Sequence, residues 1–309
     1  METGLVDTPE IFQVELTSLC NMKCLFCIHG DVKRRQKHMS LSQFCRVASY
    51  FKPGQRVGLY MMGEPLLYPH LKEAVRITRY CGAKPEIATN GRALLRQSYG
   101  DNHQKITDFL LMGLEYVILD ISWWKEDRKM MIDIANLASS IITRLLVLEH
   151  DGMQVPELAI QIVDHPDHPQ PWPNVLEHLT AQTDKVHLKR KFLDSWAGQM
   201  PEMAAVSDVT PPETRGPCPE PFSRVAITCD GDVVPCCRDG LAEYKYGNIF
   251  DNTLEQIWNG KYAVELRSIM SMEHWGALPA PCDTCREWHI NMSRQQNTEY
   301  PVKDKEVSK

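Results

Sequence analysis

The sequence predicts an α/β fold, a partial (β/α)6 barrel followed by a small Cys-rich C-terminal module. Short apolar strand candidates alternate with helical stretches as far as Phe192, which indicates parallel βα units. The stretch Met200–Pro219 then carries five prolines and is typical of a linker. The region beyond it is rich in cysteine and poor in apolar periodicity, so we expect bound metal to replace part of its core.

The first expected strand, Ile11–Leu16, runs directly into a cluster of cysteines. The other strand candidates are Arg56–Met62, Pro85–Ala88, Tyr116–Ile121, Leu158–Val163 and Val186–Phe192. Helical spacing separates them at Met39–Phe51, Pro69–Cys81, Ile106–Gly113 and Arg128–Leu148, with a short helix before the last strand. Six βα units are fewer than the eight of a full TIM barrel. We therefore expect a partial barrel over residues 1–199 and a second module over 200–309.

Composition excludes several classes of protein. No apolar run approaches the roughly 18 residues that would suggest a membrane span, and the first ten residues lack the pattern of a signal peptide. The net charge of −6 gives no electrostatic reason to expect a nucleic-acid partner. Eleven cysteines without a secretory signal indicate metal or catalytic thiols in a reducing compartment, and hence a cytoplasmic protein.

The first cysteine cluster consists of Cys20, Cys24 and Cys27, at spacings that let three thiolates in one loop converge. Iron–sulfur clusters are usually held by four cysteine thiolates, so three leave one iron open to a small molecule. A structural zinc site is the alternative, and it usually needs four nitrogen or sulfur ligands, with His29 as the candidate for the fourth.

This spacing, Cys20-x3-Cys24-x2-Cys27 with Phe26 before the last cysteine, resembles the signature of the radical S-adenosylmethionine (SAM) superfamily. Two later segments are also similar to motifs of that family. The segment Met62–Pro65 resembles its GGEP motif, with Met62 in place of the usual first glycine, and Thr89–Gly91 resembles its TNG motif. Both segments follow successive strands, where barrel sites are built.

The resemblance implies a SAM-binding 4Fe–4S cluster on the three cysteines and reductive cleavage of SAM to a 5′-deoxyadenosyl radical. It also implies an electron donor such as flavodoxin or ferredoxin. The residues it places against SAM, its ribose or the substrate are Phe26, Met62, Gly63, Glu64, Thr89, Asn90, Asp120 and Ser122.

A second group of cysteines follows the linker. Its ligand candidates are Cys218, Cys236, Cys282 and Cys285, and Asp230-Gly231 marks a hairpin turn just before Cys236. Four thiolates from three loops suit a structural zinc or a fully ligated 4Fe–4S cluster, and spacing alone leaves both open.

The stretch from Cys218 to Cys285 resembles the shortened SPASM, or twitch, module of radical SAM enzymes. The similarity rests on Val234–Cys236, Gly247–Ile249 and Leu254–Asn259. It implies one auxiliary 4Fe–4S cluster. The order of motifs is similar to that of 2-deoxy-scyllo-inosamine dehydrogenases of antibiotic biosynthesis and of radical SAM carbohydrate epimerases.

The resemblance implies abstraction of a hydrogen atom from a carbinol C–H, with two possible outcomes. In a dehydrogenase, the auxiliary cluster accepts the electron of the substrate radical and a base takes the proton. The candidate bases on strand ends are Asp120, His187, Lys189 and Arg190. In an epimerase, Cys237, which the four-thiolate site does not need, returns a hydrogen atom to the opposite face of the substrate.

A small carbohydrate or aminocyclitol is the expected substrate. Trp123 and Trp124 are candidates for stacking on a sugar ring, although for them, as for Trp172 and Trp196, packing in the interior is the simpler interpretation. Two further hypotheses are modification of a ribosomal peptide and a non-catalytic zinc or iron–sulfur binding module. The latter predicts that SAM is neither bound nor cleaved.

Overall fold

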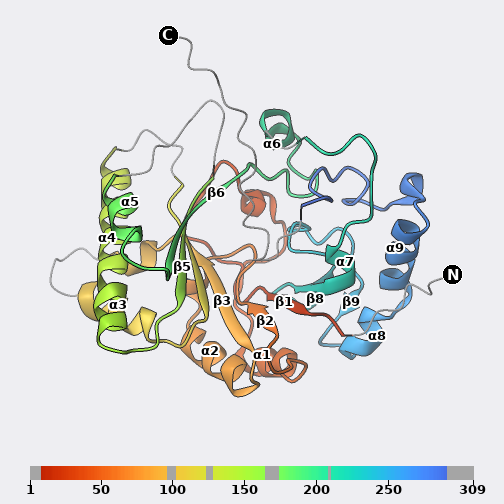
Figure 1. Ribbon diagram of the computed structural model, residues 1–309. Helices are drawn as coiled ribbons and strands as arrows, with labels where there is room; N and C mark the ends of the chain where they lie inside the picture. The colour runs from red at the N-terminus through yellow and green to blue at the C-terminus, as the bar shows by residue number, and fades with distance from the viewer. Residues whose placement is uncertain (1–7, 96–101, 123–127, 164–173, 208–209, 291–309) are drawn as a thin grey trace, which may run out of the picture.

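The computed structural model describes residues 8–95, 102–122, 128–163, 174–207 and 210–290, and it contains one large mixed sheet (Figure 1). The strand order in the sheet is β6-β5-β4-β3-β2-β1-β7-β8-β9. The strands are β1 Ile11–Val14, β2 Arg56–Gly58, β3 Lys84–Thr89, β4 Tyr116–Asp120, β5 Glu157–Val163, β6 Val186–Lys191, β7 Arg224–Ile227, β8 Asp232–Val234 and β9 Gly247–Asn248.

Helices connect the parallel strands and cover the outer side of the sheet (Figure 1). They are α1 Leu41–Ala48, α2 Leu71–Tyr80, α3 Asn102–Leu110, α4 Arg128–His150 and α5 Asn174–Thr180. The helices that come after β6 in the chain are α6 Pro201–Val206, α7 Glu220–Ser223, α8 Leu254–Trp258 and α9 Lys261–Ser271. Short 3-10 turns lie at Ile28–Asp31 (η1), Pro65–Leu67 (η2), Arg92–Leu94 (η3) and Trp275–Ala277 (η4). Among the described helices, none has the length and apolar character to cross a membrane.

Strands β1 to β6 pair in parallel and in sequence order, which confirms the predicted α/β class. Alternation along β1 shows the two sides of the sheet: Phe12 and Val14 are fully buried in the core beneath the helices, whereas Ile11 and Gln13 line a cavity on the other side. The core therefore lies between sheet and helices, and the inner side of the curved sheet is left for polar chemistry.

Three elements differ from the sequence prediction. Strand β2 ends at Gly58 rather than Met62, because the chain turns so that the Glu64 amide can donate to the Leu19 carbonyl at 2.8 Å. The expected linker contains helix α6, which has Pro201 in its first turn. The C-terminal module, predicted to be rich in loops, contains α8 and α9, and Thr253 and Gln256 form a capping box at the start of α8.

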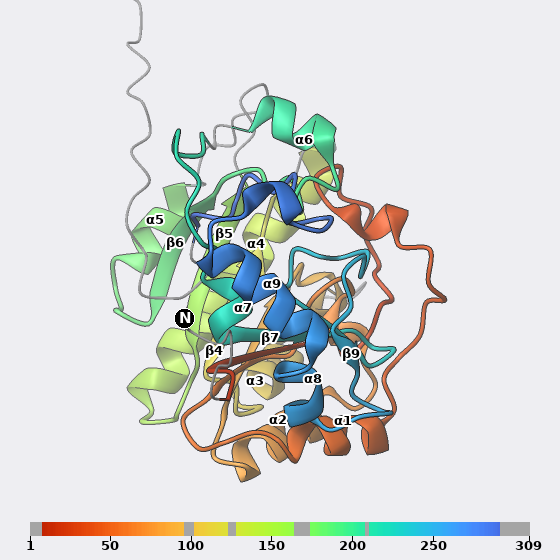
Figure 2. The ribbon, with the colours of Figure 1, turned by 90° about the vertical axis from the view of Figure 1, so that its right-hand side faces the viewer.

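The C-terminal region extends the barrel sheet. Strand β7 pairs in parallel with β1, Ile11 opposite Arg224, and the predicted hairpin is formed by β7 and β8. Figure 2 shows α8 and α9 in front of this end of the sheet. Ile227, Val233 and Trp258 belong to the same buried cluster as Phe12, so the C-terminal region shares its core with the barrel.

Candidate active site

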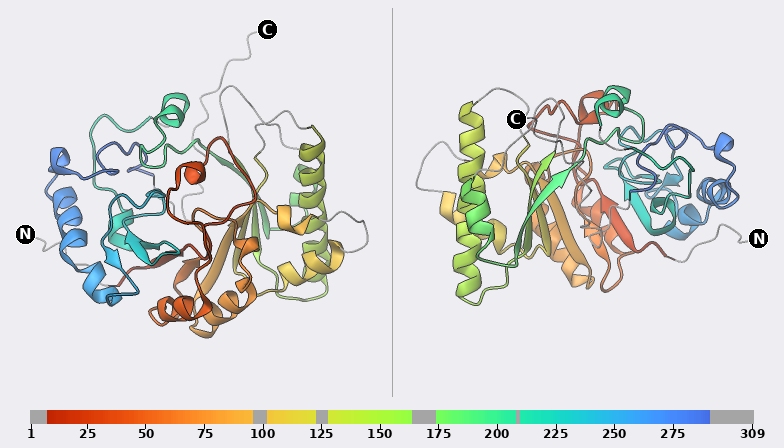
Figure 3. Two further views of the ribbon diagram at one scale, coloured as in Figure 1. Left: turned by 180° about the vertical axis from the view of Figure 1, so that it is seen from behind. Right: turned by 45° about the horizontal axis from the view of Figure 1, so that its top comes forward.

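The three N-terminal cysteines lie on the loop that follows β1. Figure 3 shows this loop, with η1, between the C-terminal region and the helices α3 and α4. Burial, together with the neighbouring Cys27, Asp120 and Cys20, raises the pKa of the Cys24 thiol to about 12. Burial likewise raises the pKa of Cys27 to about 11. Cys20, Cys24 and Cys27 are therefore close enough to influence the pKa of Cys24, as is Asp120, and a metal cluster would displace the protons of the thiols.

The zinc alternative depended on His29. Its Nε2 lies 2.8 Å from the carbonyl oxygen of Ser18. Across the described ranges, no three His, Cys, Asp or Glu side chains stand close enough to hold a single metal ion. A set of three soft thiolate donors around a partly buried loop fits an iron–sulfur cluster.

The two motif segments after β2 and β3 meet beside this loop. The Glu64 carboxylate accepts hydrogen bonds from the Thr89 hydroxyl at 2.6 Å, the Asn90 amide at 2.9 Å and the Leu66 amide at 3.0 Å. The Asn90 side chain in turn donates to Asn21 at 3.0 Å, on the cysteine loop itself. Glu64 is therefore engaged by protein donors and fastens the ends of the two strands; direct contact of these residues with SAM stays a prediction.

Gly63 is the tightest backbone contact in this arrangement. A Cβ at this position would lie 2.0 Å from the Thr17 carbonyl oxygen and 2.8 Å from that of Leu19. We expect Gly63→Ala to lower the free energy of unfolding by about 3 kcal/mol, because backbone atoms must move apart to admit the methyl group. The measurement is anaerobic urea unfolding of the reconstituted protein.

Gly30→Ala is the matched control, since Gly30 lies in η1 on the cysteine loop and nothing lies within 4 Å of a Cβ there. It should change the free energy of unfolding by less than about 0.5 kcal/mol. Equal effects of the two substitutions would contradict the packing argument.

The remaining predicted SAM and substrate contacts are placed as follows. The Phe26 carbonyl accepts a hydrogen bond from the Trp196 indole at 2.9 Å. Met62 is buried in a small apolar cluster with Ile28 and Met200. The Ser122 hydroxyl accepts from the Val163 amide at 2.7 Å, and so ties β4 to β5. Among these side chains, Met62 and Ser122 are thus engaged by protein. Trp123, Trp124 and Trp172 lie outside the described residues.

Asp120 lies at the end of β4 and is held by two hydrogen bonds. Its carboxylate accepts from the Gln161 side chain at 2.7 Å and from the Ser122 amide at 2.9 Å. Of the other candidate bases, His187 lies 3.5 Å from Glu157. Burial, with the nearby Lys191 and Arg56 cations, lowers the pKa of Lys189. Lys189 is therefore the more easily deprotonated of the lysine and arginine candidates.

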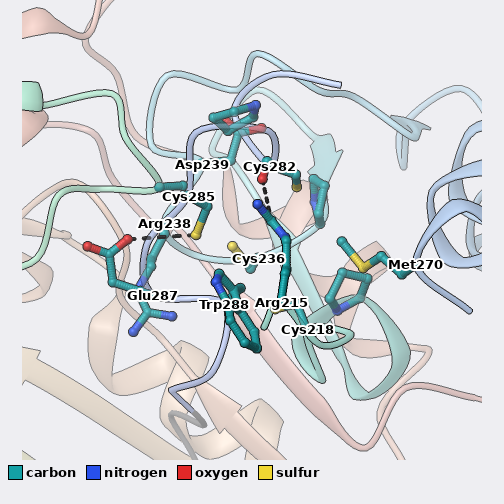
Figure 4. Close-up of a pocket in the computed structure, with 14 residues that line it drawn as sticks. Arg215, Cys218, Cys236, Arg238, Asp239, Met270, Cys282, Cys285, Glu287 and Trp288 are labelled. Atoms are coloured by element: carbon teal, nitrogen blue, oxygen red, sulfur yellow. Dashed lines mark hydrogen bonds between the residues drawn. The ribbon is translucent and has the colours of Figure 1, made fainter. Parts of the chain in front are cut away.

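The four C-terminal ligand candidates come together around one cavity of about 420 Å³ (Figure 4). Cys218 precedes α7, Cys236 follows β8, and Cys282 and Cys285 follow η4. Burial raises the pKa of Cys218 to about 11 and that of Cys282 to about 12. Four thiols that line one cavity are the donor set of a fully ligated 4Fe–4S cluster.

Cys237 does not line this cavity although it follows Cys236 directly. It lines a second cavity of about 330 Å³ on the inner side of the sheet. The other lining residues are Ile11, Gln13, Arg56, Gly58, Tyr60, Glu86 and Arg224. Burial raises the pKa of the Cys237 thiol in spite of the Arg224 cation, so the group stays protonated at neutral pH.

The second cavity, which we call the lumen cavity, has a polar wall built by ion pairs and amides. Arg56 donates to both carboxylate oxygens of Glu86, at 2.9 and 3.0 Å. Arg224 pairs with Glu220 and donates to the Gln13 side chain at 3.0 Å. Sequence reasoning did not identify these residues. A signal was present, because Gln13, Arg56 and Glu86 are polar positions within short buried strands.

A chain of contacts joins the two cysteine sites. Arg238, which lines the four-cysteine cavity, pairs with Asp194 at 2.9 Å. Asp194 accepts from the Trp196 amide at 2.8 Å, and the Trp196 indole donates to Phe26, between Cys24 and Cys27. Trp196 and Ala197 have φ values of 54° and 58°, so this connection is held in a left-handed backbone conformation.

Family models match both parts of the chain. Residues 14–117 match the radical SAM superfamily, and residues 218–286 match the SPASM iron-sulfur cluster-binding domain. GTP 3′,8-cyclase of Chlorobaculum tepidum is 31% identical over 96 residues, which are 29% of this chain and 28% of the cyclase. The tungsten-containing aldehyde ferredoxin oxidoreductase cofactor-modifying protein of Pyrococcus furiosus is 20% identical over 297 residues, 80% of each chain.

Two solved structures share the fold. BtrN in complex with AdoMet and 2-DOIA is 21% identical with a TM-score of 0.58, covering 96% of this chain and 98% of BtrN. A polyhistidine-tagged form of anSMEcpe with bound AdoMet is 15% identical with a TM-score of 0.53, covering 85% of this chain and 81% of anSMEcpe. SAM and a 4Fe–4S cluster are the cofactors of the first domain, and a further iron–sulfur cluster is that of the second. The chain therefore carries a radical SAM domain over residues 14–117 and a SPASM iron–sulfur cluster-binding domain over residues 218–286.

Proposed function

We propose that this radical SAM enzyme epimerises a carbinol carbon of a small carbohydrate or aminocyclitol-type substrate, with Cys237 as the hydrogen-atom donor. The observation that carries the proposal is that two adjacent cysteines line different cavities. Cys236 lines the four-cysteine cavity, whereas Cys237 lines the lumen cavity. A structural role in the cluster site gives no reason for a thiol on the inner side of the sheet.

When bound, the SAM-binding cluster supplies the 5′-deoxyadenosyl radical that removes a hydrogen atom from the substrate. The chain's own contribution is to hold the substrate carbon near Cys237. Arg56, Glu86, Arg224 and Gln13 offer hydrogen-bond donors and acceptors on the wall of the lumen cavity. A polar wall of this kind suits a small molecule with several hydroxyl or amino groups.

The proposed step balances in atoms and electrons. The S–H bond of Cys237 breaks, and a C–H bond forms on the face opposite to the one from which hydrogen was taken. Cys237 is left as a thiyl radical and regains its hydrogen as one electron and one proton. The electron comes from a one-electron reductant of the flavodoxin or ferredoxin class, so the product has the oxidation state of the substrate.

The experiment begins with a panel of aminocyclitols and amino sugars, scored by formation of 5′-deoxyadenosine. The active compound is then converted in deuterium oxide. We expect one non-exchangeable deuterium in a redox-neutral product, because the Cys237 thiol exchanges with solvent. Cys237→Ala should abolish this product while 5′-deoxyadenosine still forms. Cys45→Ala is the matched control, since Cys45 is an exposed cysteine on α1. A ketone that still forms in Cys237→Ala would overturn epimerisation.

Dehydrogenation is the second candidate, and two observations favour it. The four-cysteine cavity is the site that would hold a one-electron acceptor, and Lys189 has a lowered pKa that suits a base for the carbinol proton. In that case the product is a ketone, no deuterium is incorporated at carbon, and Lys189→Met slows its formation.

A further inference from the structure

The four-cysteine cavity contains a guanidinium group whose charge is not neutralised by an ion pair. Arg215 lines this cavity, and the ion pairs found among the described residues do not include it. We propose that Arg215 donates a hydrogen bond to the auxiliary cluster and raises its reduction potential. The proposal rests on the presence of that cluster and not on the reaction that the enzyme catalyses.

Arg215 is held in place by carbonyl groups and aromatic rings. Its Nη2 donates to the Cys282 carbonyl at 2.6 Å, and its Nη1 to the Asp283 carbonyl at 3.3 Å. Its guanidinium carbon lies 5.8 Å from the ring centroid of Trp275 and 5.9 Å from that of Trp288. These contacts fix the plane of the guanidinium and leave its full positive charge beside the ligands.

One donor of Arg215 remains unused. Its Nε is buried and has no hydrogen-bond partner among the described residues. A buried N–H without an acceptor is destabilising because it has lost its hydrogen bonds to water, so this group needs an acceptor in the assembled protein. Figure 4 shows the Arg215 side chain among the four cysteines, in front of Trp288. The thiolate and sulfide sulfurs of a cluster in this cavity are acceptors at that place.

The other charged groups at the cavity differ from Arg215. Arg238 also has a buried donor, Nη2, without a partner among the described residues, but its charge is neutralised by Asp194 at 2.9 Å, and Figure 4 shows it beside Glu287. The Glu287 carboxylate lies 3.7 Å from the Cys285 sulfur and accepts from the Ser195 amide at 2.7 Å. The Asp239 carboxylate accepts hydrogen bonds from the amides of Glu243 and Tyr244 and from the Gln199 side chain. Arg215 is thus the cation here without a carboxylate partner among the described residues.

The charge of a nearby side chain decides whether it raises or lowers the reduction potential of the auxiliary cluster. A cluster with four thiolate ligands gains negative charge on reduction, so a nearby cation and a hydrogen bond to sulfur favour the reduced state. Removing Arg215 should therefore lower the potential, whereas removing the charge of Glu287 should raise it. Opposite shifts from two substitutions at one cavity are difficult to obtain from general disruption of the fold.

The first test is an anaerobic redox titration of the reconstituted enzyme, followed by electron paramagnetic resonance. Arg215→Met should lower the midpoint potential of the auxiliary cluster, Arg215→Lys should lower it less, and Glu287→Gln should raise it. All variants should keep the iron content of the wild type. Arg46→Met, an exposed arginine on α1, is the control and should shift neither cluster. An unchanged auxiliary potential in Arg215→Met at full iron content would overturn the proposal.

The second test detects the proposed hydrogen bond directly, first in the wild-type enzyme. Wild-type enzyme grown with 15N-arginine and reduced with dithionite should show a 15N hyperfine coupling to the auxiliary cluster in pulsed electron paramagnetic resonance. The coupling should persist in Arg238→Lys and disappear in Arg215→Lys. Absence of any arginine coupling in the wild-type enzyme would show that Arg215 does not donate to the cluster.

Discussion

Replacing Cys20, Cys24 and Cys27 together by alanine is expected to abolish SAM cleavage and to remove about half of the bound iron. Two 4Fe–4S clusters correspond to about eight iron atoms per chain, and loss of the N-terminal cluster leaves about four. Cys20 and Cys27 both raise the pKa of Cys24, and the three cysteines share one loop, so the variant loses the donor set as a unit. The measurements are iron and sulfide analysis after anaerobic reconstitution and chromatography of 5′-deoxyadenosine.

The complementary variant replaces Cys218, Cys236, Cys282 and Cys285. It should also retain about four iron atoms but keep the ability to cleave SAM, because the N-terminal site is untouched. Cys45→Ala combined with Cys81→Ala is the control for loss of thiols, and it should keep about eight. If the N-terminal triple variant retained no iron, or cleaved SAM, the assignment of two separate clusters would be wrong.

Much of the barrel was predictable from local pattern. Strand β5 has all of its residues after Glu157 buried, and such a run, apolar except for Gln161, identifies a strand within a parallel sheet. The cysteine triplet was equally visible, because three ligands in one loop have a spacing that does not depend on the rest of the fold. The capping pair Ser40 and Gln43 similarly fixes the start of α1 from residues next to one another.

What the sequence did not show depends on contacts between distant segments. The pairing of β7 with β1 joins residues more than two hundred positions apart, and neither strand's pattern specifies its partner. The opposite directions of Cys236 and Cys237 follow from how β8 ends, which spacing does not encode. Arg215 stands in a loop rich in proline and glycine, where a single arginine is normally solvated; its position became apparent from the cavity that it lines.

Two sets of contacts hold the loop that carries the first three cysteines, and both join it to the C-terminal region. On one side, the Trp196 indole donates to the Phe26 carbonyl. The Trp196 amide donates to Asp194, which pairs with Arg238 at the four-cysteine cavity. On the other side, Arg34 joins the same loop to β1 and to the C-terminal region. Both connections cross between barrel and auxiliary module, so their loss should affect the relative position of the two cluster sites.

Arg34→Met is expected to lower the free energy of unfolding by about 3–5 kcal/mol, because it leaves a buried carboxylate without its cation. Arg34 donates to both oxygens of Glu15, at 2.8 and 2.6 Å, and the Glu15 side chain is fully buried. Arg34 also donates to the Gly240 carbonyl at 3.0 Å. The measurement is anaerobic urea unfolding of the reconstituted protein at neutral pH.

Two further variants separate the buried charge from other effects of the substitution. Lys37, on the same segment as Arg34, forms a half-exposed ion pair with Asp230 at 2.6 Å. Lys37→Met removes this pair and should lower the free energy of unfolding by less than about 1 kcal/mol. Glu15→Gln combined with Arg34→Met removes both charges, so it should recover a large part of the loss seen in Arg34→Met alone. If the double variant were as unstable as Arg34→Met alone, the penalty would lie in lost packing. Recovery would instead show that Arg34 holds the cysteine loop in place by neutralising Glu15 on β1.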